Sequence, residues 1–429
     1  MQRILALLLL AAVWNPLAHG QRLSGRFLTS FYTWERFDTV GVSTHYLRGY
    51  EGLQIDFVQK DFSLHTYFQG MTNFGNAFGT DPSFRFYNLY VRWKNIGGVG
   101  EVQFGRVPFY AGAGSGTVDG AVGRLRVWHG KLQLTTYAGG NVQEQQKLKV
   151  HADVDKNFTW GGQLVARPIE DLSIGASYVN RRNEPVAYVA LRPDSLFNPV
   201  PVVVSRTSRA EQLASGDARY QWRDRLTGYA RYDYDMNLDR TYRSEVSLRV
   251  RVTDQVAATG DYLYRAPRIP FNSIFSVFTY GILREWEGGI EYTFTPSVHA
   301  FTRVAALRYS DTNSTRWTVG ANARYASLSY SFSNGYSGEL SGITAQAAYP
   351  LRSRTVIPTA AVSYARYKLS ESQASSDEAV SGLVGVTFRP VRFFSFDLQG
   401  QWLRNSIVQN DLRLFGKITY WFSEPVNIF

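Results

Sequence analysis

The chain has 429 residues, no cysteine, 44% hydrophobic and 15% aromatic residues, and a formal net charge of +11 at pH 7. Without cysteine it cannot hold a disulfide framework, a cysteine-ligated metal or a covalently attached c-type haem. Its one long apolar run lies at the start, which excludes a helical membrane protein, and its evenly spread aromatic and β-branched residues exclude disorder. The composition therefore indicates a folded, strand-rich chain.

The first 20 residues have the pattern of a secretory signal peptide. Arg3 provides a basic start, Ile4 to Val13 an apolar core, and Ala18-His19-Gly20 a cleavage site of small residues. We therefore set residues 1–20 aside as a signal peptide and expect residues 21–429 to be exported.

Beyond the signal, apolar and polar residues alternate with a period of two. In Glu245–Val252 the valines and the leucine share one parity, while the glutamate, serine and arginines share the other. Segments of about ten residues with this pattern repeat to the C-terminus without helical periodicity, which is typical of transmembrane β-barrels.

The connections between these segments alternate between short and long. We expect an all-β, antiparallel, up-and-down transmembrane β-barrel over residues 21–429, with about 22 strands and a range of 16 to 22. Short turns would face the periplasm and longer loops the exterior. The long connections are expected at Arg36–His45, Gly70–Ser83, Pro108–Gly120, Asn141–Asn157, Arg182–Gln212, Ala266–Leu283 and Ser370–Glu378.

Aromatic residues of the apolar parity recur just before or at the short turns. Rings at one depth match a lipid–water interface. They are Trp93, Trp222, Phe294, Tyr325, Tyr349, Phe388 and Phe422.

The last predicted strand, Leu412–Phe422, looks like the terminal strand by which the insertion machinery recognises outer-membrane barrels. With the strand pattern before it, the chain resembles a Gram-negative outer-membrane β-barrel of the porin-like kind. The resemblance implies an outer-membrane location, contact with membrane lipid, insertion by that machinery and, as in many porins, a homotrimer. The chain departs from the family by continuing past Phe422, with Pro425 in the extension.

Arginine dominates the basic residues, with 38 arginines against 8 lysines. Many arginines have the polar parity, so we expect them to line a water-filled pore and to favour anions weakly. They are Arg124, Arg126, Arg219, Arg231, Arg249, Arg251, Arg316, Arg324, Arg389 and Arg413.

The alternative is that these arginines pair with carboxylates and merely connect the strands of the wall. Both roles remain open from sequence, but a nucleic-acid partner is not expected, because the charge is spread over many strands. The candidate carboxylates are Asp217, Asp233, Asp235, Asp261, Glu285, Glu287, Glu291 and Asp397.

The glycine-rich segment Phe109–Gly120 is the third long connection. In general porins the loop at this position folds inward, so the resemblance implies a constriction, with Asp119 facing Arg106, Arg124 and Arg126. The alternative is an ordinary flexible outer loop. No phosphate-binding glycine motif is present.

No enzyme, metal site or cofactor is predicted. The mature chain contains His45, His65, His129, His151 and His299, and none has a recognised catalytic spacing.

The expected strand count raises an alternative function. Barrels of 16 to 18 strands leave an aqueous channel, whereas 22-stranded transporters have a plugged lumen. The first strand is expected at about Leu23, which leaves no N-terminal plug. Inward loops such as Arg182–Gln212 could fill the lumen. Otherwise the barrel could be a sheath around a periplasmic multihaem cytochrome, as in porin–cytochrome electron conduits.

Overall fold

The computed structural model describes residues 21–425 apart from 40–41, 77–82, 144–145, 151–152, 185–186, 194–197, 205–210, 268–280, 311, 336–337 and 369–372. The predicted signal peptide, residues 1–20, and the last four residues lie outside the described part of the chain.

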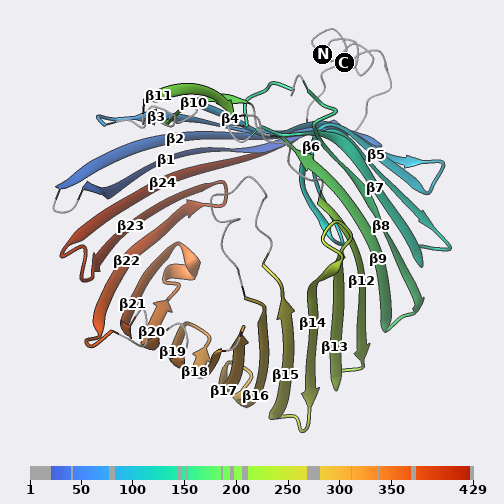
Figure 1. The fold of residues 1–429 in the computed structure, drawn as a ribbon. Helices are drawn as coiled ribbons and strands as arrows, with labels where there is room; N and C mark the ends of the chain where they lie inside the picture. The colour runs from blue at the N-terminus through green and yellow to red at the C-terminus, as the bar shows by residue number, and fades with distance from the viewer. Residues whose placement is uncertain are drawn as a thin grey trace.

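Twenty-two strands form one closed barrel, and a separate two-stranded hairpin, β10–β11, lies in one connection (Figure 1). The elements are β1 Gln21–Thr39, β2 Val42–Gln59, β3 Phe62–Asn73, β4 Phe84–Ile96, β5 Gly100–Ala111, β6 Gly114–Val127, β7 Leu132–Asn141, β8 Asn157–Ile169, β9 Leu172–Asn183, β10 Tyr188–Pro193, β11 Pro199–Val204, β12 Glu211–Trp222, β13 Leu226–Asp235, β14 Arg240–Arg251, β15 Val256–Arg265, β16 Leu283–Thr295, β17 Val298–Tyr309, β18 Thr312–Ala323, β19 Ala326–Gly335, β20 Glu339–Ala348, the 3-10 helix η2 Arg352–Arg354, β21 Val356–Lys368, β22 Asp377–Val391, β23 Phe394–Arg404 and β24 Asp411–Pro425.

Every barrel strand pairs antiparallel with its neighbours in sequence, β9 pairing with β12 across the β10–β11 connection. The first strand also pairs with the last, from Arg22 opposite Pro425 to Tyr32 opposite Phe415. This pairing closes the barrel and confirms the predicted all-β, up-and-down architecture with 22 strands. The last strand extends three residues past the predicted end at Phe422.

The alternation in the sequence separates the two faces of the wall. In β16 the exposed Trp286, Ile290 and Phe294 point outward, while Glu285 and Glu287 have the opposite parity and face the lumen. Six of the seven predicted interface aromatics are exposed on the outward face near the short turns, as expected: Trp93, Trp222, Phe294, Tyr325, Tyr349 and Phe388.

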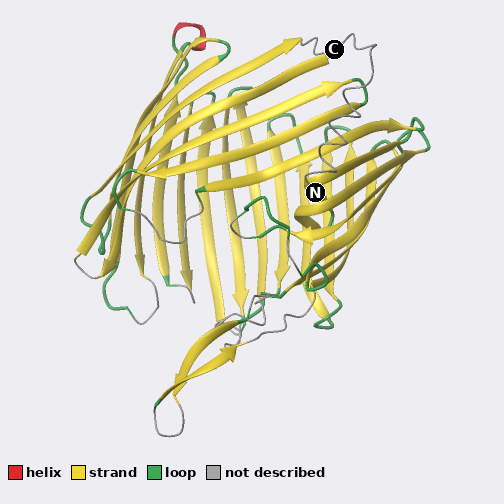
Figure 2. Ribbon diagram, turned by 90° about the horizontal axis from the view of Figure 1, so that it is seen from above, coloured by secondary structure: helices red, strands yellow, loops and turns green. Residues whose placement is uncertain are grey.

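Short turns gather at one end of the barrel, which we call the turn end, and the opposite end is the loop end. Figure 2 shows η2 at the turn end and the β10–β11 hairpin projecting beyond the loop end. The predicted long connection at Arg36–His45 is wrong, because β1 and β2 are 19 and 18 residues long and leave only residues 40–41 between them.

No helix among the described residues has both the length and the apolar character needed to cross a membrane.

Candidate pore and its inner wall

The predicted loop Pro108–Gly120 is instead a strand hairpin, in which β5 and β6 pair up to Ala111 and Gly114 and leave a two-residue turn. This correction has a physical reason. Gly105, at φ +128°, takes up a bend that a residue with a Cβ could not, because a Cβ there would lie 2.3 Å from the Leu89 carbonyl oxygen. Beyond the bend β5 leaves β4, since their pairing ends with Leu89 opposite Arg106.

Past the bend, the hairpin packs across the inner face of the strands that follow it. Val107, Phe109 and Val118 form one buried cluster with Tyr137 of β7, Val179 of β9 and Leu213 of β12, and the Phe109 and Tyr137 ring centroids are 4.0 Å apart. At the tip, the Ala113 amide donates to the Ser177 hydroxyl at 2.8 Å. The segment therefore occupies part of the lumen, as a strand hairpin and not as a loop.

A buried ion pair holds the hinge of this hairpin. Arg106 donates to both carboxylate oxygens of Asp119, at 2.7 and 2.8 Å, and to the carbonyls of Phe86 and Gln146 at 3.1 and 3.2 Å. The two side chains are 2% and 9% exposed. The predicted facing of Arg106 and Asp119 is present, but their burial prevents the pair from lining an open channel.

Arg124 and Arg126 do not face Asp119, because they have the opposite parity on β6. Arg124 instead bonds Glu101 at 3.0 Å, and Glu101 also accepts from Arg92 at 2.7 Å.

The described inner face of β12–β18 carries eight arginines and nine carboxylates, and we call it the charged arc. Its arginines are Arg219, Arg231, Arg243, Arg249, Arg251, Arg265, Arg303 and Arg316. Its carboxylates are Glu211, Asp217, Asp233, Asp235, Asp261, Glu245, Glu285, Glu287 and Glu291.

Within the charged arc, arginines and glutamates alternate in one connected ladder. Arg316 bonds Glu285 and, at 2.8 Å, Glu287. Arg303 lies 3.7 Å from both Glu287 and Glu291, and Glu291 also pairs with Arg249 at 2.9 Å. The ladder joins β14, β16, β17 and β18, so it connects non-adjacent strands by charge–charge contacts in addition to the backbone hydrogen bonds. Sequence reasoning missed Arg303, although its polar parity in β17 would have indicated it.

The predicted lumen arginines therefore divide into two groups. The paired group has a carboxylate within 4 Å: Arg106, Arg124, Arg231, Arg249, Arg316 and Arg413. In the described part of the chain the other group has no such partner: Arg126, Arg219, Arg251, Arg324 and Arg389.

Four of the five unpaired arginines share a location, on β6, β12, β14 and directly after β18. Arg126 is next to last in β6, Arg219 lies three residues before the end of β12, Arg251 ends β14, and Arg324 follows β18 directly. All four are exposed and lie toward the turn end. We call these four residues the turn-end arginines.

The inner face of β19–β21 is uncharged, and we call it the neutral arc. Three serines of β19 face glutamine, threonine and glycine of β20, which in turn face alanine and serine of β21. Its inward residues include Ser329, Ser331, Thr344, Gln346, Ala361 and Ser363.

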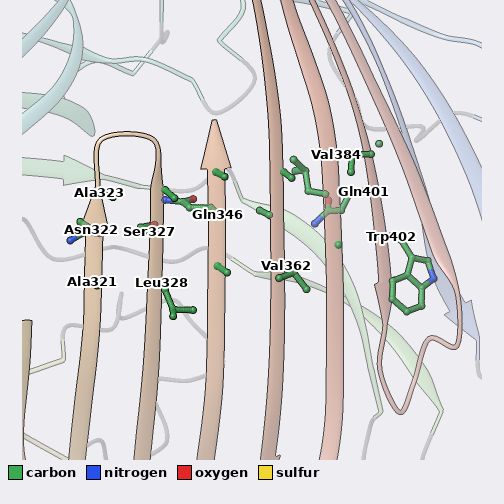
Figure 3. Close-up of a pocket in the computed structure, with 18 of the residues that line it drawn as sticks. Ala321, Asn322, Ala323, Ser327, Leu328, Gln346, Val362, Val384, Gln401 and Trp402 are labelled. Carbon is green, nitrogen blue, oxygen red and sulfur yellow. The ribbon is translucent and has the colours of Figure 1, made fainter. Parts of the chain in front are cut away.

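An apolar groove of about 850 Å³ runs along β18 to β23 (Figure 3). Leu328, Val362, Val384 and Trp402 among its lining residues are exposed and have the outward parity. Small residues such as Ala345 lie between them. The groove therefore belongs mainly to the outer surface of the barrel and not to its lumen.

One histidine lies in a hydrogen-bonded chain that the sequence did not indicate. His65 Nδ1 lies 2.5 Å from Asp56 Oδ1, and its Nε2 lies 2.8 Å from the Ser63 hydroxyl. Ser63 is only 4% exposed, and the His65 ring stacks on Tyr90 at 4.9 Å. Because Ser63 is buried, we interpret Asp56, His65 and Ser63 as a hydrogen-bonded link between the neighbouring strands β2 and β3. The Ser63-Leu64-His65 alternation was the available signal.

No protein-family model and no curated protein matches this sequence. Among solved structures, OccAB4 of Acinetobacter baumannii is similar over 96% of this chain and 100% of its own, with 10% identity and a TM-score of 0.43. The outer membrane protein opdK of Pseudomonas aeruginosa is similar over 94% of this chain and 99% of its own, with 9% identity and a TM-score of 0.43. A BenF-like porin of Pseudomonas fluorescens Pf-5 is similar over the same shares, with 7% identity and a TM-score of 0.43.

Proposed function

We propose that the chain forms a porin-like, water-filled pore in the outer membrane, through which small hydrophilic solutes diffuse passively. The observation that carries this proposal is the closed 22-strand barrel, with exposed apolar side chains outside and a charged or hydroxyl-rich face inside. Such a wall is stable only where lipid lies outside and water inside. Membrane lipid, the barrel-insertion machinery and a homotrimer are the partners that this proposal includes.

A weak preference for anions is part of the proposal, and the turn-end arginines support it. With Arg219 and Arg251 included, the charged arc has eight arginines against nine carboxylates, so its net charge is small. The four exposed guanidiniums of Arg126, Arg219, Arg251 and Arg324 lack a carboxylate among the described residues and lie near one mouth. Unpaired positive charge at a mouth raises the local concentration of anions.

Conductance of the purified, refolded protein in a planar bilayer tests both statements. Discrete channel openings support the pore, and a barrel that inserts without conducting would overturn it. In a salt gradient we expect a reversal potential with the sign of an anion-selective channel. The double substitution Arg126→Gln with Arg251→Gln should shift this potential toward the value of a cation-selective channel. The matched control, Arg126→Lys with Arg251→Lys, keeps the charge and should keep the reversal potential. Equal values for both pairs would contradict the role of these arginines.

The alternative, a sheath around a multihaem cytochrome, is not favoured. The β5–β6 hairpin already occupies part of the lumen with residues of this chain, and its tip is bonded to the wall at Ser177. A sheath would need that space for its partner.

A further inference from the structure

Two arginines lie directly opposite each other on the outward face of the barrel. The register pairs Arg284 of β16 with Arg308 of β17, and both side chains are exposed. Directly opposite side chains in a sheet have Cβ atoms about 4.5–5.5 Å apart, and like charges in that arrangement repel. The pair is therefore unfavourable unless an anion lies between the two guanidiniums.

Among the described residues, no carboxylate neutralises either arginine. In the part of the chain that the structure describes, no carboxylate lies within 4 Å of either guanidinium. Arg308 donates only a 3.3 Å bond to the Ser310 carbonyl, and Arg284 lies over the Tyr264 ring at 5.8 Å. The β15–β16 connection, residues 266–282, contains no aspartate or glutamate, whereas the β17–β18 turn contains Asp311, which lies outside the described residues.

The depth of the pair indicates the kind of anion. Arg284 and Arg308 are the second residue of β16 and the next-to-last residue of β17, both at the loop end. One row deeper on the same outward face, Trp286 packs beside Tyr262, with ring centroids 5.7 Å apart. Tryptophan and tyrosine mark the boundary between acyl chains and headgroups. Cations just beyond that boundary are level with the lipid headgroups.

We propose that Arg284 and Arg308 bind the phosphate of a lipid headgroup in the leaflet at the loop end. Two guanidiniums on adjacent strands can each donate two hydrogen bonds to one phosphate, while the acyl chains lie against Trp286 and Tyr262. The phosphate also removes the repulsion between the two arginines. This site needs only a barrel in a membrane and does not depend on whether the pore conducts.

The test compares the thermal stability of the folded barrel in neutral detergent with and without added lipid. Dihexanoyl phosphatidic acid should raise the unfolding midpoint of the natural sequence, whereas dihexanoyl phosphatidylcholine and inorganic phosphate should raise it less. Arg284→Gln with Arg308→Gln should abolish the difference. Each arginine removed should weaken the binding of phosphatidic acid roughly tenfold.

A matched control removes two arginines from the other end of the barrel, Arg352→Gln with Arg354→Gln in η2, and should keep the response to phosphatidic acid. In neutral detergent alone, the Arg284 and Arg308 variant should be at least as stable as the natural sequence, because repulsion is lost. Loss of stability there, an equal loss of response in the control, or an equal response to free phosphate would overturn the proposal. Conductance measured in parallel separates this outcome from failure of the pore.

Discussion

The charged arc and the neutral arc line the same lumen with opposite chemistry. The charged arc spans β12–β18 and holds eight arginines and nine carboxylates among its described residues, most of them in contact with an opposite charge. The neutral arc spans β19–β21 and presents small hydroxyl, amide and methyl side chains. Removing one charge from the first leaves its partners uncompensated, whereas a change in the second affects only the water beside it. The two arcs should therefore respond very differently to substitution.

The largest effect is expected in the charged arc, from Arg316→Met. The substitution removes the guanidinium that Glu285 and Glu287 share, and these two side chains are 17% and 14% exposed. Because Arg316 itself is 36% exposed, we expect a loss of about 1–3 kcal/mol, below the 3–5 kcal/mol of fully buried pairs. The measurement is urea unfolding of the refolded barrel.

The same variant should also move the reversal potential toward cations, since two carboxylates are left unpaired. Adding Glu287→Gln to Arg316→Met should restore part of that shift. A variant with unchanged stability and unchanged selectivity would show that the ladder is not a coupled unit.

A smaller effect on stability is expected from placing a charge in the neutral arc. Gln346→Arg adds a guanidinium that faces Ser327 and Ala361, where no carboxylate is near. Stability should stay within about 0.5 kcal/mol, while anion selectivity rises. Gln346→Met provides a control of similar length without the charge. If Gln346→Arg destabilises the barrel as strongly as Arg316→Met, the distinction between the arcs fails.

The smallest effect should come from salt alone. Raising the ionic strength from about 0.1 M to about 1 M shortens the screening length from about 10 Å to about 3 Å. The anion preference that we propose for the exposed turn-end arginines should then fade, and the closely paired ladder should lose little stability. Reversal potentials at constant activity ratio measure the first effect, and unfolding midpoints in both salts measure the second. If ion selectivity and stability were equally sensitive to salt, the distinction between exposed turn-end arginines and paired ladder arginines would be contradicted.

The barrel could be predicted from sequence because its signal is local and repeated. Parity alone distinguishes Trp286 from Glu285, and that distinction recurs in nearly every strand. The β5–β6 hairpin could not be predicted in the same way. Its glycines at 112, 114 and 116 favour a loop by composition, and only the alternation of Val107, Phe109 and Ala111 indicates a strand.

The ion pairs could not be predicted from the sequence, for a different reason. Whether Arg249 meets Glu291 depends on the register of β14, β15 and β16 together, since the two residues are 42 positions apart. A shift of one residue in any of these strands would turn one partner to the lipid side. Hence the arginines could be assigned to the inner face, but not divided into paired and unpaired groups.

The pairing of β1 with β24 has a consequence for how the molecule is built. Arg22 donates to Ser423 across 401 positions of sequence, so the contact that closes the barrel joins nearly the first and the last described residues. Until β24 is present, β1 and the most recent strand both keep an open edge of unpaired amides and carbonyls. A chain that lacks its final strand should therefore remain an open sheet, prone to pair with other chains. Closure is an event that only the finished polypeptide can undergo, and the first strand must stay unpaired on one side until then.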